Sequence, residues 1–253
     1  LDIVSRKEHE KFKQAKNIQR VMLAASHDLR VMVIKLADKL HNLRTLEHLS
    51  KEKRIRIASE TLQIYVPLAH KLGMHQVMHE LEDLSFQFID PKKFLKLKQK
   101  VEAHRKPLIQ SIEQVIQNLR KKTKIKADFW VYKKSVFSIY SKLKRTGKAM
   151  NESYDCAVLN VVVPSTRDCY DILGDIHLAY PPIPNKFKDY IAIPNTNLYR
   201  ALHTTIIGEH GRPIKVYIAA KKMNEVNQKG FVAIADSEKN SFSGLNERIK
   251  KLN

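Results

Sequence analysis

The sequence is poor in several residue types, and each shortage narrows what the chain can be. Only two cysteines occur among 253 residues, Cys156 and Cys169, which is too few for a disulfide framework and lacks the spacing of a zinc site. Acidic residues are also scarce, with 26 aspartates and glutamates against 46 lysines and arginines. No apolar run approaches the ~20 residues that a membrane helix needs. We therefore expect a cytoplasmic protein with no membrane partner.

The formal net charge of +20 predicts a surface that attracts phosphate groups. Charge alone does not distinguish a nucleotide from RNA or from an anionic membrane. Residues 96–122 form a lysine-rich amphipathic pattern, which is typical of a solvated helix face and leaves contact with RNA or a membrane as the alternative. A basic module that binds RNA or the ribosome is therefore one hypothesis for this chain.

A polar stripe interrupts the otherwise apolar segment 32–46. Lys35, Asp38, Asn42 and Thr45 are separated by three, four and three positions, so a helix places them on one side. A bare carboxylate buried in such a helix would cost several kcal/mol, and we therefore expect Asp38 to meet a cation. Either a salt bridge to a nearby lysine or arginine or a metal ion would satisfy it, and the spacing alone favours the salt bridge.

Helical spacing dominates the first half of the chain. It predicts helices around residues 21–25, 29–46, 55–72, 75–88 and 96–122. Gly73 suits a helix end, and Asp90 with the proline after it suits a helix start. The adjacent His27 and Asp28 are interpreted as a helix N-terminus capped by Ser26 or Asp28, and not as a metal-binding pair.

The pattern changes near residue 124, where strands begin to mix with helices. It predicts strands over residues 125–131, 157–163, 190–193, 203–207 and 214–219, helices over 136–143 and 169–179, and a proline-rich loop at 181–184. This mixture is typical of an α+β sheet domain. We divide the chain into residues 1–95, a helical linker at 96–126, a sheet domain at 127–235 and a polar tail at 236–253.

Several of these segments resemble the long RelA/SpoT family, the enzymes of the alarmone (p)ppGpp. The resemblance is carried by KLADKLHNLRTL (35–46), ETLQIYVPLAHKLGM (60–74), ELEDLSF (80–86), SVFSIYSKL (135–143), DCYDILGDIH (168–177), FKDYIAIP (187–194) and NLYRALHTT (197–205). It implies that residues 1–95 are the C-terminal part of an all-helical HD-type phosphohydrolase. A nucleotidyltransferase-like mixed sheet with flanking helices would follow.

The hydrolase of this family uses Mn²⁺ to remove the 3′-pyrophosphate from ppGpp or pppGpp. The resemblance implies that Asp38 is a metal ligand and that Asn42 and Thr45 contact the nucleotide. Lys35 and Arg44 are either neighbours of the phosphates, or solvated, or paired with an acidic side chain. The family's remaining ligands, a His and a His-Asp pair, lie further upstream than the residues before Asp38 allow. Those ligands either precede the given chain, which does not begin with Met, or have been lost.

The second half resembles the family's synthetase domain, which transfers pyrophosphate from ATP to GDP or GTP. Asp155 matches the Mg²⁺ ligand, and Lys134 matches a phosphate-binding lysine. The resemblance also identifies four departures, because Tyr132, Asn160 and Ala219 stand where the family has arginines and Lys215 stands where it has a catalytic glutamate. A lysine at a Mg²⁺ site repels the ion. We therefore expect the Mg²⁺ site and the synthetase activity to be lost.

The position of Tyr199 matches the family's guanine-stacking tyrosine, and His203 lies in the same block. A remnant pocket for GDP or GTP and ordinary core packing are both open for these two residues. The favoured hypothesis is a (p)ppGpp 3′-pyrophosphohydrolase without synthetase activity. The alternative is a pseudoenzyme that binds nucleotides for regulation and has neither activity.

Overall fold

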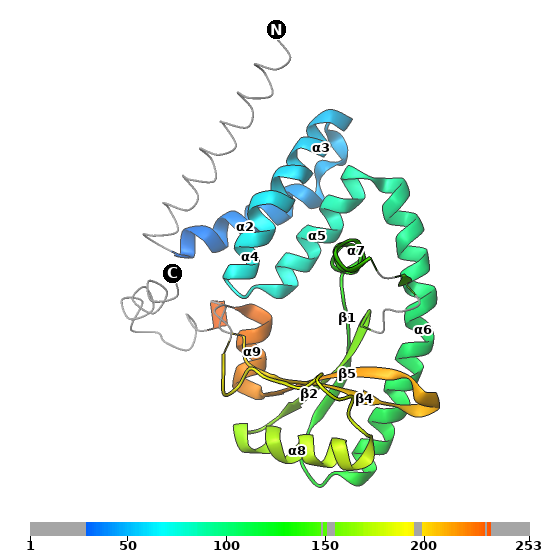
Figure 1. Cartoon of the computed structure of the whole chain (residues 1–253). Helices are drawn as coiled ribbons and strands as arrows, with labels where there is room; N and C mark the ends of the chain where they lie inside the picture. Colours follow the sequence, from blue (N-terminus) through cyan, green and yellow to red (C-terminus); the bar gives the residue numbers. More distant parts are fainter. Residues whose placement is uncertain (1–28, 148, 151–154, 195–198, 231, 234–253) are drawn as a thin grey trace.

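The computed structural model describes residues 29–147, 149–150, 155–194, 199–230 and 232–233. Within these residues, a group of helices lies at one end and a mixed sheet at the other, and one long helix runs along both (Figure 1). The fold is α+β, as the sequence predicts. The segments predicted at 21–25 and 236–253, and the Ser26, His27 and Asp28 group, lie outside the described residues.

The helical region is built on α2 (Leu29–Arg44), η1 (Leu46–His48), α3 (Lys51–Glu60), α4 (Val66–Lys71) and α5 (His75–Ile89). Its core forms because the apolar positions of α2 face α5, so that Met32, Leu36 and Leu43 share one buried cluster with Met78 and Leu81. None of the described helices is both long and apolar enough to span a membrane.

The segment predicted as one helix over 55–72 is interrupted by a π-helical turn, η2 (Thr61–Tyr65), between α3 and α4. Pro67 accounts for the break, because it has no N–H to donate to the preceding turn. The Thr61 hydroxyl donates to the Ile57 carbonyl at 2.8 Å. π-Helical turns are rare in proteins, and those that occur often lie at functional sites. This one presents Tyr65 to α2, where Lys39 Nζ lies 4.5 Å from the centre of its ring.

The long helix α6 (Pro91–Lys122) joins the helical region to the sheet. Asp90 caps it by accepting a hydrogen bond of 3.0 Å from the Lys93 backbone, and the helix continues through Pro107. The helix predicted over 96–122 therefore continues one that begins at Pro91, and the division at residue 95 falls inside it.

The sheet contains β1 (Asp128–Lys133), β2 (Ala157–Val163), β3 (Lys188–Asp189), β4 (Leu202–Ile207) and β5 (Pro213–Ala220), in the order β1-β2-β5-β4-β3. Only β2 and β5 run parallel among these neighbours. The elements around it are α7 (Val136–Thr146), α8 (Thr166–Ala179), the short η4 (Glu209–Gly211) and α9 (Lys221–Lys229).

Residues of β2 alternate between two faces of the sheet, and this alternation positions the site. Leu159 and Val161 enter the core that α6 and α8 cover, together with Ile172 of α8. Asn160 points to the other face, where the register pairs it with Trp130 of β1 and Tyr217 of β5. Polar and aromatic side chains thus share the face on which α9 lies.

Two predicted strands differ from the observed ones. The strand predicted over 190–193 is a turn, because Asp189 Oδ1 accepts hydrogen bonds from the Ile191 and Ala192 backbones at 2.9 and 2.8 Å. The strand predicted over 125–131 begins three residues later. There the Thr123 hydroxyl accepts from the Ile125 backbone at 3.1 Å, which holds the start of that segment in the connection after α6.

The end of α9 approaches the α4–α5 turn closely at Gly230. Gly174, in α8, has open space around it, so alanine substitutions at the two glycines should have opposite effects on stability. Gly230 has φ +60°, and a Cβ there would overlap the Leu72 carbonyl oxygen and lie 2.6 Å from the Gly73 carbonyl carbon. Gly230→Ala should therefore lower the free energy of unfolding by at least ~2 kcal/mol. Gly174→Ala should raise it by about 0.5–1 kcal/mol, because Gly174 lies inside α8 with open space around it.

Denaturant unfolding of both variants measures the difference. A Gly230→Ala protein as stable as the unmodified one would contradict the close packing between α9 and the α4–α5 turn.

Candidate functional site

The predicted polar stripe lies along the solvent side of α2. Lys35, Asp38 and Asn42 are exposed on the helix, and Thr45 is exposed in the turn that follows it. Asn42 Nδ2 donates to Asp38 Oδ2 at 3.3 Å. The Thr45 hydroxyl donates to the carbonyl oxygens of His41 and Asn42, at 3.2 and 3.3 Å. The four predicted residues therefore do share one side of this segment, with their side chains accessible.

Exposure changes the reasoning about Asp38. The expectation that this carboxylate is buried and so must meet a cation is wrong, because Met32, Leu36 and Leu43 form the buried face of α2 while Asp38 is exposed. Two other cations of α2 pair elsewhere, with Lys39 3.3 Å from Glu60 and Arg44 2.6 Å from Glu80. Within the described part of the chain, Asp38 forms no ion pair.

A divalent ion at Asp38 would need further ligands. Among the described residues, no three histidines, cysteines, aspartates or glutamates gather closely enough to hold a metal. Asp38 offers one carboxylate of suitable chemistry, so the other ligands would have to lie outside those residues. The Tyr65 hydroxyl is a neighbour that the sequence reasoning missed: its pKa is raised by burial and by the negative charges of Glu60 and Asp38.

A second group of charges surrounds Asp155 at the start of β2. This residue is only 3% exposed, and its Oδ2 atom lies 3.3 Å from Lys134 Nζ, 2.5 Å from Lys142 Nζ and 3.2 Å from Lys215 Nζ. Burial opposes its ionisation, but the three lysines outweigh burial and hold the pKa of Asp155 well below its usual range. We call these four residues the lysine cluster. Two of them, Asp155 and Lys134, are predicted site residues, whereas Lys142 was missed.

Buried Arg105, 4% exposed, fixes the backbone on both sides of the lysine cluster. From α6, its Nε donates to the Cys156 carbonyl at 3.2 Å and its Nη2 to the Lys134 carbonyl at 2.7 Å. Sequence reasoning missed it. The available signal was an arginine on the apolar face of a helix, four residues after Val101 and three before Leu108.

Helix α5 of the helical region forms hydrogen bonds with the start of α7, the helix that carries Lys142. From α5, Glu82 accepts a hydrogen bond of 2.6 Å from the Ser135 hydroxyl. Asp83 accepts from the backbone N–H groups of Val136 and Phe137 at 3.1 and 2.9 Å. Asp83 thus satisfies two otherwise unpaired N–H groups of α7, while Glu82 holds the hydroxyl of Ser135, whose oxygen accepts from the Ser138 N–H.

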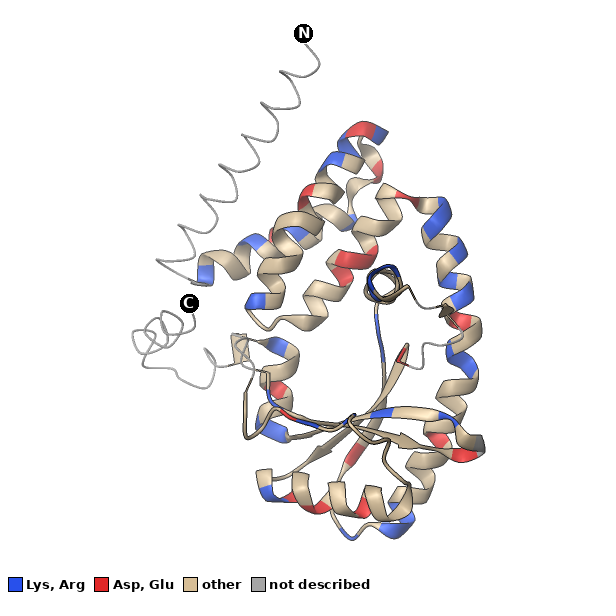
Figure 2. Ribbon diagram, in the orientation of Figure 1, with Lys and Arg blue, Asp and Glu red and all other residues tan. Residues whose placement is uncertain are grey.

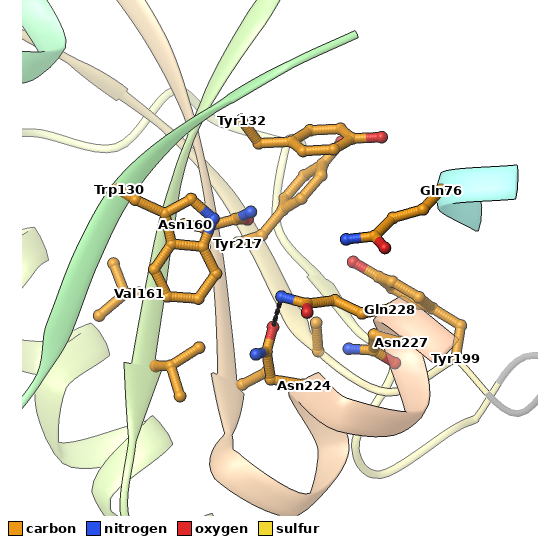
Figure 3. Close-up of a pocket in the computed structure, with 13 residues that line it drawn as sticks. Gln76, Trp130, Tyr132, Asn160, Val161, Tyr199, Tyr217, Asn224, Asn227 and Gln228 are labelled. Atoms are coloured by element: carbon orange, nitrogen blue, oxygen red, sulfur yellow. Dashed lines mark hydrogen bonds between the residues drawn. The ribbon is translucent and has the colours of Figure 1, made fainter. Parts of the chain in front are cut away.

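A pocket of about 140 Å³ opens on the same face of the sheet. Figure 3 shows Trp130, Tyr132 and Tyr217 on one side, Gln76 reaching in from α5, and polar residues of α9 below. The residues of α9 that line it are Asn224, Asn227 and Gln228, and Gln228 donates to Asn224 at 3.3 Å. Aromatic faces combined with amide donors and acceptors are suited to a flat polar ligand.

Tyr199 and His203 are partners beside this pocket. The Tyr199 hydroxyl and His203 Nε2 share a hydrogen bond of 2.7 Å, and the His203 ring stacks on Tyr217 with centroids 3.8 Å apart. Burial, assisted by Lys215 and Lys134, lowers the pKa of His203 to about 3, so the ring is neutral at physiological pH. Tyr199 lines the pocket. His203 does not line it, but its ring stacks on Tyr217, which does.

Two family models match different parts of the chain. A family model described as a region found in RelA / SpoT proteins matches residues 132–239, and an HD domain model matches residues 2–75. A GTP pyrophosphokinase of Myxococcus xanthus is 40% identical over 224 residues, covering 87% of this chain and 30% of the relative. A guanosine-3′,5′-bis(diphosphate) 3′-pyrophosphohydrolase of Vibrio cholerae is 40% identical over 234 residues, covering 91% and 33%.

The bifunctional (p)ppGpp synthase/hydrolase SpoT of Escherichia coli is 40% identical over 223 residues, covering 87% of this chain and 32% of that protein. The chain therefore spans about a third of the length of these relatives. Their names include both the synthesis and the hydrolysis of the same nucleotide.

Acid should destabilise the sheet region through His203. Its folded pKa of about 3 lies below the usual ~6.5 of an unfolded histidine. Its contribution is therefore complete above pH 6.5 and is lost as the pH falls toward 3. The free energy of unfolding should drop by up to ~1.4 kcal/mol per pH unit from this group. His203→Phe keeps the stacking on Tyr217 but cannot titrate, so its stability should depend less on pH between 6.5 and 4.

Chemical denaturation across this pH range provides the measurement. His75 acts in the same direction, because burial and then the neighbouring His70 and His79 lower its pKa to about 4. His75→Phe combined with His203→Phe should flatten the profile further. Equal slopes for the unmodified and His203→Phe proteins would contradict a neutral, buried His203.

Proposed function

Because this chain belongs to the RelA/SpoT family, we propose that it is part of a (p)ppGpp 3′-pyrophosphohydrolase that has lost its synthetase activity. The relatives are named for both activities, so family membership does not choose between them. The observation that carries the choice is the lysine cluster, in which Lys215 Nζ lies 3.2 Å from the Asp155 carboxylate. A family that acts on (p)ppGpp with an HD domain implies a divalent metal, which we propose to be Mn²⁺.

The polar stripe on α2 and the turn after it, which we call the α2 stripe, supports the hydrolase half of this proposal. Asp38 would be one ligand of the ion, with the others supplied from outside the described residues. When bound, such an ion polarises the phosphoryl group and lowers the pKa of a water molecule. Asn42 and Thr45 would position the nucleotide of ppGpp or pppGpp, and Lys35 lies one turn before Asp38 where it can neutralise phosphate charge. All four side chains are accessible on α2 and its following turn.

The lysine cluster supports the loss of the synthetase half. Mg²⁺ requires oxygen ligands in nearly octahedral geometry, but the carboxylate of Asp155 already accepts hydrogen bonds from three ammonium groups. A further cation would meet three positive charges at short range. The residues present therefore do not fit Mg²⁺. GDP or GTP binding without chemistry is proposed for the adjoining pocket, on the basis of Tyr199 and the amides of α9.

Two further features enter the proposal as expectations about context. Free, buried Cys156 and Cys169 are consistent with a reducing cytoplasm. Many of the exposed lysines lie along α6 (Figure 2), and this is the surface on which contact with RNA or the ribosome would form. The alternative to the hydrolase, a pseudoenzyme with neither activity, keeps the same remnant pocket and is separated by the assay below.

The hydrolase proposal predicts Mn²⁺-dependent turnover that depends on Asp38. The full-length protein should release pyrophosphate from ppGpp when Mn²⁺ is supplied, and Asp38→Ala should reduce the rate by at least ~100-fold, since a ligand matters more than the residues that orient it. Asp171→Ala, an exposed change on α8, is the matched control and should leave the rate unchanged. Absence of turnover in the unmodified protein would favour the pseudoenzyme.

The lost synthetase predicts that no AMP forms when the full-length protein is incubated with ATP, Mg²⁺ and GDP or GTP. Chemistry of this kind depends on charge neutralisation by metal and phosphate-binding groups. In the lysine cluster, an ammonium group, that of Lys215, lies beside Asp155 at the place where a second metal-binding carboxylate would be needed. Chromatography of the nucleotides is the measurement, with an active relative assayed in parallel as the control. Formation of AMP at a comparable rate would overturn this half of the proposal.

A further inference from the structure

The lysine cluster has an unbalanced charge, and the imbalance indicates a ligand. Three ammonium groups, from Lys134, Lys142 and Lys215, surround the single carboxylate of Asp155. We propose that this cluster is a metal-independent binding site for a diphosphate group. The inference rests on the proposed loss of the synthetase Mg²⁺ site and gives that site a ligand that it takes without any divalent cation.

Hydrogen-bonding capacity supports this assignment. Each ammonium group has three N–H donors, and each directs one toward the same oxygen, Asp155 Oδ2. The remaining donors of all three lysines are therefore available. The lysine side chains are 20%, 35% and 26% exposed, whereas that of Asp155 is 4% exposed, so a ligand reaches the cations and not the carboxylate. An anion with several oxygens fits such a surface.

The cluster is held in place before any ligand arrives. Arg105 binds the carbonyl groups of Lys134 and Cys156, and Asp83 holds the first turn of the helix that carries Lys142. Lys215 lies inside β5, paired with Thr205 of β4. Binding to groups fixed in this way costs less ordering entropy than binding to freely moving surface lysines.

The positive charge of the lysine cluster also affects His203, whose ring stacks on Tyr217. Burial lowers the pKa of His203, and the charges of Lys215 and Lys134 lower it further. Among the described residues, Asp155 is the carboxylate that forms ion pairs with the three lysines. A diphosphate would replace solvent as the counterion of the remaining charge, and the same potential would draw it in from solution.

The shared chemistry has two sources, inorganic pyrophosphate and a nucleoside diphosphate. Tyr132 and Tyr217 lie two residues from Lys134 and Lys215 on the same face of β1 and β5, and both line the pocket in Figure 3. A ring in that pocket would place its attached phosphates toward the cluster. Tighter binding of GDP than of pyrophosphate would identify the nucleotide as the source, and equal binding would identify the free anion.

Calorimetric titration of the full-length protein with inorganic pyrophosphate, in EDTA and at constant ionic strength, tests the proposal. Binding should occur without metal, and Lys142→Gln and Lys215→Gln should each weaken it by about tenfold, the effect of losing one charge-assisted hydrogen bond. Lys215→Arg should retain most of the affinity. Lys124→Gln, an exposed lysine outside the cluster, is the matched control and should have no effect.

The effect of Asp155→Asn on the affinity for diphosphate should be opposite to the effect expected at a metal site. A site that binds diphosphate through a metal loses affinity when its carboxylate is removed. The lysine cluster should instead keep or gain affinity, by up to about tenfold, because the lysines lose the competing anion. Thermal unfolding with and without pyrophosphate provides the second measurement, since a bound ligand raises the melting temperature of any variant that folds.

Three results would overturn the proposal: no binding in EDTA, binding that appears only with Mg²⁺, or equal losses in Lys215→Gln and Lys124→Gln. Its failure is distinct from that of the proposed function. Hydrolysis of ppGpp that depends on Asp38, with no binding of pyrophosphate at the cluster, would reject the anion site alone. Formation of AMP from ATP and GDP would reject the loss of synthesis whatever the calorimetry gives.

Discussion

The carboxylate of Asp155 is almost completely buried, and a buried charge must be compensated where it stands, since leaving it bare costs more than most single contacts supply. Its compensation comes from three separate elements: the connection after β1, helix α7 and strand β5. One oxygen atom thus ties together parts of the chain that are far apart in sequence. The start of β2 and the face of the sheet that carries the pocket are arranged around it.

The same region is where the helical part of the chain meets the sheet. α5 contributes on both of its sides: Glu80 pairs with Arg44 of α2, while Glu82 and Asp83 hold Ser135 and the first turn of α7. Helix α5 therefore contacts both the end of α2, through Arg44, and the start of α7, the helix that carries Lys142. Any displacement of α5 relative to the sheet would change the backbone from which Lys134 and Lys142 project.

The sequence predicts those elements that local chemistry determines. The apolar run at 157–163 became β2, and the capping signal at Asp90 became the start of α6. It fails where a side chain far along the chain decides the outcome. The burial of Asp38 was misjudged because the direction in which α2 faces is set by α5, and the buried Arg105 depends on distant carbonyl groups. The turn after Asp189 is a local miss, because its side-chain hydrogen bonds to the backbone are not contained in the spacing of apolar residues.

The exchange that the family resemblance implies, a lysine at position 215 in place of a glutamate, would be compatible with the fold for an electrostatic reason. Two carboxylates at this depth, Asp155 and a glutamate on β5, repel each other unless a divalent ion lies between them. A lysine on β5 supplies the positive charge from within the chain, at 3.2 Å from the same oxygen. The buried aspartate is then compensated whether or not metal is present. Retaining Asp155 next to a lysine thus follows from the cost of burying a charge and does not require that the site still performs synthesis.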